Sequence, residues 1–181
     1  MVLTRTVALV GMMGVGKTSI GKRLAVRLDV PFTDADQAIE SAAGMTVKEI
    51  FAKYGEPEFR RLERNVIARL LAGPAHVLAT GGGAYMDETT RTAMRDAAFT
   101  IWLRAPISVL LERVKKRQGA DQTRPLLAQG DMRATLEKLL EVRSPVYASA
   151  DMMLDVAQEP HAVQVDKIVA ALAHNRLCEV P

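Results

Sequence analysis

The chain has 181 residues, of which 49% are hydrophobic and 25% are charged, so it can bury a core of its own and needs neither a disulfide nor a metal to fold. Its net charge of +3 is too small to indicate nucleic-acid binding, which usually comes with a concentrated basic surface. No apolar run approaches the ~20 residues of a membrane-spanning helix, so we expect no membrane partner.

Short apolar segments alternate with amphipathic ones along the whole chain. We predict strands over residues 7–10, 31–33, 76–80, 99–103 and 152–156. Most of them are continuous apolar runs, which is typical of parallel strands covered on both faces. Helices are predicted between them, because apolar residues recur four positions apart, as at Ile20, Leu24 and Leu28. The alternation predicts a single α/β domain over 1–181, with one parallel sheet and helices on both faces.

The first predicted strand runs directly into the sequence GMMGVGKT at 11–18, a P-loop pattern between a strand and a helix. Its glycines let successive backbone N–H groups surround phosphate oxygens, and the helix that follows adds its partial positive charge. Lys17 supplies a full charge between the β- and γ-phosphates, and the Thr18 hydroxyl can bind Mg²⁺. A P-loop also occurs in GTPases, motor ATPases and ATP sensors, so the other strand ends must identify the activity.

Two carboxylates, Asp34 and Asp36, follow the second predicted strand. On an extended segment, side chains two residues apart can serve different tasks: one can hold the water shell of Mg²⁺, while the other faces an acceptor hydroxyl. The alternative is that one of them only caps the helix predicted from residue 37 to 43. The position beside a P-loop, at the carboxyl end of a strand, favours the functional interpretation.

Arginines and glycines mark the remaining strand ends and loops. Arg60 and Glu63 lie three apart on a predicted helix, which fits either a surface ion pair or an arginine oriented toward a substrate carboxylate. The sequence TGGG at 80–83 follows the third strand and offers backbone donors to a ligand.

The polar segment 117–130 is predicted to be a lid, with Arg124 aimed at the transferring phosphoryl group. Its alternative is an ordinary solvated loop.

Taken together, the motifs occur in the order and spacing of one enzyme family. The P-loop, DAD at 34–36, FRRLE at 59–63, ATGGG at 79–83, RPLL at 124–127 and RSPVY at 143–147 resemble those of the shikimate kinases over nearly the whole chain. The resemblance implies a P-loop nucleoside monophosphate kinase-like fold, with five parallel strands in the order 2-3-1-4-5. It also implies ATP-dependent phosphorylation of the 3-hydroxyl of shikimate, in aromatic amino-acid biosynthesis.

The resemblance also implies a role for each matching residue. Asp36 contacts the shikimate hydroxyls and is the candidate base, Mg²⁺ is held by Thr18 with Asp34 near its water shell, and Lys17, Asp36 and Arg124 form the catalytic set. The shikimate carboxylate is held by Arg60 and Arg143, and Gly82 contributes backbone donors. The implied ATP-binding residues are Gly14, Val15, Gly16, Lys17, Thr18, Ser19, Arg117 and Arg124. One departure is the segment 157–159, which lacks an arginine that some members place against adenine.

Two alternatives remain open from the sequence. A gluconate kinase also binds a hydroxylated acid with one carboxylate, whereas a non-catalytic ATP-binding regulator should have lost Lys17, Asp36 or Arg124, none of which is lost here. We expect the partners to be shikimate and MgATP, and the protein to act as a monomer, although no sequence feature fixes the oligomeric state. The single cysteine, Cys178, can form no internal disulfide, so we expect a cytoplasmic location.

Overall fold

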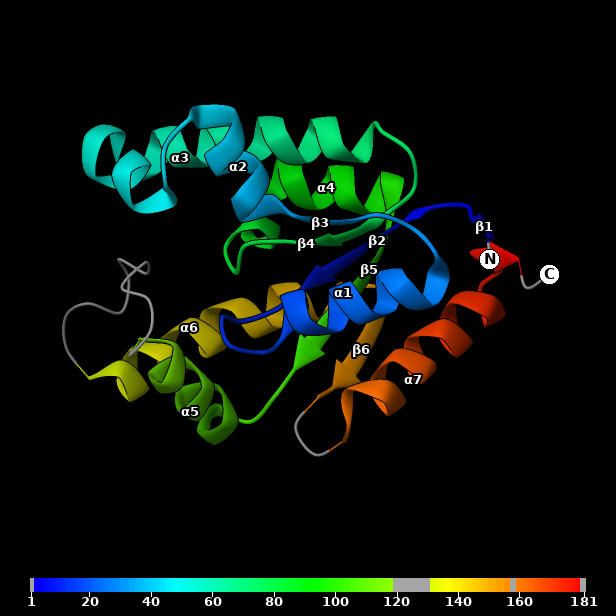
Figure 1. Ribbon diagram of the computed structural model, residues 1–181. Coiled ribbons are helices and arrows are strands. Elements are labelled where there is room, and N and C mark those ends of the chain that lie inside the picture. The colour runs from blue at the N-terminus through cyan, green and yellow to red at the C-terminus, as the bar shows by residue number, and fades with distance from the viewer. Residues whose placement is uncertain (1, 119–130, 157–158, 180–181) are drawn as a thin grey trace.

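The structure is a computed structural model that describes residues 2–118, 131–156 and 159–179 (Figure 1). The predicted lid over 117–130 and its Arg124 lie almost entirely outside the described residues, as does most of the departing segment 157–159. In chain order the elements are β1 (Val2–Leu3), β2 (Thr6–Val10), α1 (Lys17–Leu28), β3 (Phe32–Asp34), α2 (Ala35–Ala43), α3 (Val47–Leu71), β4 (Val77–Ala79), the 3₁₀ helix η1 (Ala84–Met86), α4 (Glu88–Ala97), β5 (Ala98–Arg104), α5 (Ile107–Gln118), α6 (Met132–Tyr147), β6 (Met152–Asp155), α7 (His161–His174) and β7 (Cys178–Glu179).

The five predicted strands form one parallel sheet in the order β3-β4-β2-β5-β6. Counted over these five strands alone, this is the predicted order 2-3-1-4-5, which is thereby confirmed. Strand β2 is central and is buried along its whole length, which explains its continuous apolar sequence. Helices α1 and α7 lie side by side on one face of the sheet, and α3 and α4 lie together on the other (Figure 1).

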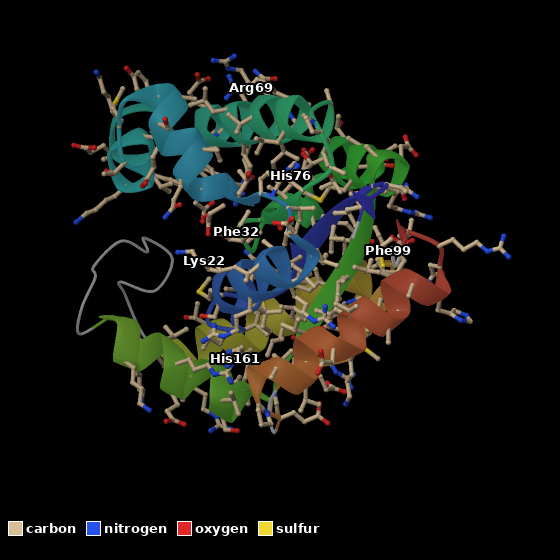
Figure 2. The ribbon with its side chains drawn as sticks, turned by 45° about the vertical axis from the view of Figure 1, so that its right-hand side comes forward. Lys22, Phe32, Arg69, His76, Phe99 and His161 are labelled. Atoms are coloured by element: carbon tan, nitrogen blue, oxygen red, sulfur yellow. The ribbon has the colours of Figure 1, made fainter. Side chains whose placement is uncertain are left out.

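Close packing of α1 on the sheet depends on a glycine in the helix. A side chain at Gly21 would place its Cβ 2.5 Å from the ring of Phe32, which projects from β3 toward α1 (Figure 2). The helix can therefore approach the edge strand only where residue 21 has no side chain. This contact positions the first half of α1 against the start of β3.

The register of the strands brings three strand ends level. Ala79 of β4 is paired with Leu9 of β2 on one side and with Asp34 of β3 on the other. Thr80 continues the alignment, since its N–H and its hydroxyl both donate to the Leu9 carbonyl, at 3.2 and 3.1 Å. The P-loop, the two carboxylates and the triple glycine therefore leave the sheet at the same edge.

Some predicted boundaries shift, and two short strands were not predicted. Helix α2 begins at Ala35 rather than at residue 37, and its N-cap is Asp34, whose side chain accepts from the Asp36 N–H.

The two unpredicted strands, β1 and β7, pair antiparallel close to both termini (Figure 1), and Cys178 is buried in β7. Among the described residues, no helix is long and apolar enough to cross a membrane.

Candidate active site

A cavity of about 330 Å³ opens at the carboxyl edge of the sheet. Its walls are the P-loop, the segment 34–40, residues of α3 between 47 and 63, the segment 79–83 and one side chain of α6. It is where parallel α/β sheets place their ligands. Nine of the predicted site residues line it, namely Gly14, Gly16, Lys17, Thr18, Asp34, Asp36, Arg60, Gly82 and Arg143.

The P-loop takes the conformation that only glycines adopt easily. Gly14 and Gly16 have φ values of 79° and 108°, and Gly16 is the N-cap of α1 without any side-chain cap. The first N–H groups of α1 therefore face the cavity, ready for an anion. The Lys17 ammonium donates to the carbonyls of Gly11 and Met12, at 2.7 and 3.0 Å, so it lies folded along the loop.

Helix α5 supports the P-loop from outside, which the sequence analysis missed. The Arg113 guanidinium donates to the Val15 carbonyl at 2.9 Å. Burial lowers the pKa of His161, at the start of α7, and the nearby charges of Arg23 and Arg113 lower it further. Basic side chains from α1, α5 and α7 therefore lie near one another, and the one from α5 contacts the loop. Nothing in the local sequence around Arg113 signals this contact, because it spans 98 positions.

One carboxylate connects the P-loop helix to the acceptor side of the cavity. Asp34 Oδ2 accepts from the Thr18 hydroxyl at 3.0 Å, while Oδ1 accepts from the Asp36 N–H at 3.1 Å. Asp34 thus both caps α2 and lies beside the expected Mg²⁺ ligand. Among the described residues no group of three or more His, Cys, Asp or Glu could hold a metal. Mg²⁺ usually keeps several waters and takes only one or two protein ligands plus phosphates, so the pair Thr18 and Asp34 fits it.

The ion pair of Arg60 and Glu63 is not the surface pair that the sequence left open. Glu63 is only 2% exposed, and its Oε2 accepts from Arg60 Nη1 at 2.6 Å. Burial raises the pKa of the Glu63 carboxyl above its ordinary value, and the Arg60 charge opposes that shift. For Arg60, burial alone would lower the pKa, but Glu63 and Glu56 raise it. Arg60 is therefore a cation fixed in place by its carboxylate partners, and it lines the cavity.

The triple glycine is needed because charged side chains approach its backbone from two directions. A Cβ at Gly83 would lie 2.6 and 2.8 Å from the Nη2 and Nη1 atoms of Arg60. A Cβ at Gly81 would lie 2.9 Å from Asp36 Oδ1 and 3.0 Å from Glu63 Oε1. The glycines thus allow the carboxylates and the arginine to gather around one strand end. Gly81 and Gly83 are therefore positions of close approach between backbone and charged side chains.

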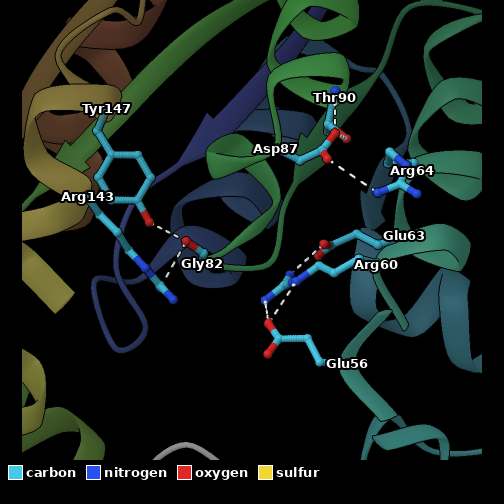
Figure 3. Close-up of polar contacts among 9 residues, drawn as sticks. All are labelled: Glu56, Arg60, Glu63, Arg64, Gly82, Asp87, Thr90, Arg143 and Tyr147. Atoms are coloured by element: carbon cyan, nitrogen blue, oxygen red, sulfur yellow. Dashed lines mark hydrogen bonds and ion pairs between the residues drawn. The ribbon is translucent and has the colours of Figure 1, made fainter. Parts of the chain in front are cut away.

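Arg143 reaches the same segment from α6. It is only 7% exposed, and its Nη1 donates to the Gly82 carbonyl at 3.0 Å (Figure 3). The Tyr147 hydroxyl donates to the same carbonyl. Tyr147 is fully buried against Tyr85 and Trp102, which fixes its ring. Arg143 and Tyr147 are one helical turn apart in the sequence, a spacing that could have indicated their shared target.

The structure brings nine of the predicted residues to one cavity, whereas Val15 and Ser19, predicted to bind ATP, do not line it. Asp36, Arg60, Gly82 and Arg143 line the same cavity as Lys17 and Thr18. The expected role of Gly82 gains a second part, since its carbonyl is an acceptor for Arg143 and Tyr147. Arg117 lies at the end of α5, but its side chain is outside what the structure describes. The site has a phosphate cradle on one side and, on the other, cations and carboxylates suited to a hydroxylated acid.

The chain matches one enzyme family over most of its length. Residues 13–173 match the family model of shikimate kinase. A shikimate kinase of Rhodopseudomonas palustris is 51% identical over 177 residues, which are 98% of this chain and 85% of the relative. One of Zymomonas mobilis is 50% identical over 168 residues, which are 93% of each chain.

A solved structure agrees in fold. The shikimate kinase from Acinetobacter baumannii in complex with shikimate matches with a TM-score of 0.89 at 34% sequence identity, over 96% of each chain. The likeness therefore extends from the ordered motifs to the arrangement of the whole sheet and its helices. By sequence along nearly its full length, and by fold, this chain belongs to the shikimate kinase family.

Proposed function

We propose that this protein transfers the γ-phosphoryl group of MgATP to the 3-hydroxyl of shikimate, giving shikimate 3-phosphate and ADP. The observation that carries the proposal is the placement of Arg60, Arg143 and Asp36 around the same cavity as the P-loop. Two cations suit the single carboxylate of shikimate, and Asp36 suits its hydroxyls. The partners proposed are shikimate and MgATP, bound by a single copy of the chain.

The nucleotide side is assigned to the P-loop. The backbone N–H groups of residues 14–19 would hold the phosphates, and Lys17 would leave the carbonyls of Gly11 and Met12 for the β- and γ-phosphoryl oxygens. A cation placed there offsets the charge that develops as the phosphoryl group moves. Arg117 and Arg124 are proposed to complete this side near the adenine and the phosphates, on the resemblance of their motifs alone.

The acceptor side is assigned to residues from three elements. Arg60 and Arg143 would hold the shikimate carboxylate, each already anchored by a protein acceptor, Glu63 and the Gly82 carbonyl respectively. Asp36 would accept a hydrogen bond from the 3-hydroxyl. In the transfer, the hydroxyl oxygen forms a bond to Pγ while the bond from Pγ to the bridging oxygen breaks. The hydroxyl proton passes to Asp36, and ADP leaves.

Mg²⁺ is the proposed cofactor, and Thr18 and Asp34 are the residues that would hold it. Their oxygens lie 3.0 Å apart beside the P-loop. When bound, the ion neutralises charge on the β- and γ-phosphoryl oxygens. Asp34 also fixes the Asp36 N–H, so the same carboxylate keeps the proposed base at the start of α2.

A coupled assay of ADP release tests the proposal. The purified protein is given MgATP alone, MgATP with shikimate, and MgATP with gluconate. We expect ADP release only with shikimate, together with a stoichiometric phosphorylated product. Equal or faster turnover of gluconate would instead assign the site to that acid. ADP release at the same rate without any acceptor would mark the protein as an ATPase, and absence of turnover with every acceptor would favour a regulator.

A further inference from the structure

The guanidinium of Arg60 is held by two carboxylates, and only one of them is buried. Glu63 Oε2 accepts from Nη1 at 2.6 Å. Glu56 Oε1 accepts from Nη2 at 3.1 Å and from Nε at 3.3 Å, so a single oxygen spans the Nε–Nη2 edge (Figure 3). All three side chains come from α3.

The edge that Glu56 covers is the one that an incoming carboxylate needs. Arginine binds a carboxylate best through two parallel N–H donors on one edge of its plane. The Nη1 atom is already taken by Glu63, and Gly83 lies so close to Nη1 and Nη2 that not even a Cβ would fit there. The Nε–Nη2 edge is therefore the forked edge left for a ligand, and Glu56 occupies it.

The two carboxylates differ in how easily they can leave. The side chain of Glu63 is 2% exposed, so moving it would take a buried carboxylate away from its cation, Arg60, which is itself half-buried. The side chain of Glu56 is 56% exposed, and its contacts to Arg60 are longer. Glu56 also directly follows Gly55, whose non-helical φ of 79° and ψ of 176° break α3. Glu56 is thus a first-turn residue that can turn its carboxylate into water.

We infer that Glu56 is an internal competitor for the acceptor: its carboxylate occupies the Arg60 edge in the substrate-free protein and is displaced when the carboxylate of shikimate binds. The inference rests on the proposed function and deepens it, because it assigns the affinity for the acid partly to a residue that opposes binding. On binding, the shikimate carboxylate must displace the Glu56 carboxylate from Arg60. The net free energy gained there is therefore the difference between the interactions of these two carboxylates with Arg60.

The size of the effect follows from the exposure of the pair. An exposed ion pair at i,i+4 spacing shifts the equilibrium between its paired and unpaired forms by up to about fivefold. An apparent dissociation constant rises in proportion as the binding-competent fraction falls. Removing the Glu56 charge should therefore tighten shikimate binding about twofold to fivefold. The turnover number should not change, since the competitor has already left when the phosphoryl group moves.

The test compares Glu56→Gln with Glu58→Gln and with the unaltered protein. Glu58 is a matched control: it lies in the same turn of α3 and pairs with Arg61, at 2.6 and 2.8 Å, away from Arg60. The shikimate dissociation constant is measured by calorimetry, and the shikimate and ATP KM and kcat by ADP release, at about 10 mM and 500 mM salt. The uncharged carboxamide analogue of shikimate is titrated as a second ligand.

We expect Glu56→Gln to lower the shikimate dissociation constant and KM twofold to fivefold at low salt, and less at high salt, where the exposed pair is screened. Its kcat, its ATP KM and its affinity for the carboxamide should stay within error, and Glu58→Gln should change nothing. Unchanged or weaker shikimate binding in Glu56→Gln would overturn the inference, and weaker binding would make Glu56 a second support for Arg60. If Glu56→Gln increased the affinity for the carboxamide analogue as much as that for shikimate, this would overturn the inference as well. If the unaltered protein binds no shikimate, the proposed function itself fails, a result that appears before any variant is compared.

Discussion

The hydroxyl of Thr18 and the carboxylate of Asp34 are 3.0 Å apart and join the two sides of the cavity. Thr18 belongs to the first turn of the P-loop helix, and Asp34 caps the helix that carries Asp36. A single carboxylate therefore links the P-loop helix to the helix that carries the proposed base.

Lys17→Ala should lower kcat on the order of 10²-fold or more, because it removes a cation that meets charge developing in the transition state. The melting temperature should stay close to that of the unaltered protein, since the lysine contacts loop carbonyls and not the core. Lys22→Ala is the matched control, as Lys22 is an exposed lysine on the same helix. A folded Lys17→Ala variant with near-normal kcat would remove the P-loop assignment.

Arg60→Ala should raise the shikimate KM at least ~10-fold while the ATP KM hardly moves. The reason is the loss of charge-assisted hydrogen bonds to the carboxylate, each worth roughly 1.5–3 kcal/mol. Lysine at position 60 should recover only part of the loss, because a point charge cannot reproduce the fork. Arg61→Ala provides the control, since the neighbouring Arg61 pairs with Glu58 and is largely exposed. Equal KM values for shikimate in both variants would contradict the carboxylate clamp.

Gly83→Ala should keep the fold but raise the shikimate KM roughly tenfold. Its new Cβ would lie 2.6–2.8 Å from the Arg60 guanidinium, the mobile end of a long side chain, so the guanidinium moves and the backbone does not. Losing one well-placed charged hydrogen bond accounts for about that factor. Gly73→Ala is the control, because its nearest neighbour would be a carbonyl at 3.4 Å, far from the cavity. A loss of stability without a change in KM would show that Gly83 serves the fold alone.

Tyr147→Phe and Tyr85→Phe should have different effects on stability, although both rings are fully buried and stack on each other. The Tyr147 hydroxyl donates to the Gly82 carbonyl, so its removal should cost about 1 kcal/mol of unfolding free energy. The buried Tyr85 hydroxyl has no hydrogen-bond partner within the described structure, so its removal should be neutral or stabilising. Urea unfolding measures both, and an equal loss in the two variants would contradict the contrast.

Asp87 provides a prediction on pH. Burial tends to raise the pKa of Asp87, but hydrogen bonds from Thr90 and the charge of Arg64 outweigh it and lower that pKa below its ordinary value. The unfolded state therefore binds more protons in acid, so the stabilisation is full above about pH 5 and is lost as the pH falls through the lowered value.

Asp87→Asn keeps a cap for α4 without the charge, and so isolates this effect. At pH 7 we expect the free energy of unfolding of the unaltered protein to be a few tenths to about 1 kcal/mol larger than that of Asp87→Asn. This difference should shrink toward zero as the pH falls to 3. Free energies of unfolding from urea titrations at pH 7, 5, 4 and 3 supply the comparison. A gap that stays constant or widens in acid would contradict the lowered pKa.

Much of this protein can be predicted from its sequence, because the relevant signals are short-range. Continuous apolar runs identify the sheet strands, and the sequence GMMGVGKT at 11–18 identifies the phosphate cradle. The order of the later motifs identifies the family, and with it the strand order that the structure confirms. Periodicity and turn chemistry depend on residues close together in the sequence, so they can be recognised without knowledge of the fold.

The tertiary structure alone decided which charges meet. Whether the Arg60–Glu63 pair was a surface pair could not be read from its spacing, since burial depends on what packs over α3. That Gly83 must lack a side chain follows from an arginine 23 positions earlier, and the Gly82 carbonyl finds its donors 61 and 65 positions later. The pairing of β1 with β7 joins the two ends of the chain. Such contacts form only when the sheet brings distant segments to one edge, because no local preference specifies a neighbour that far away.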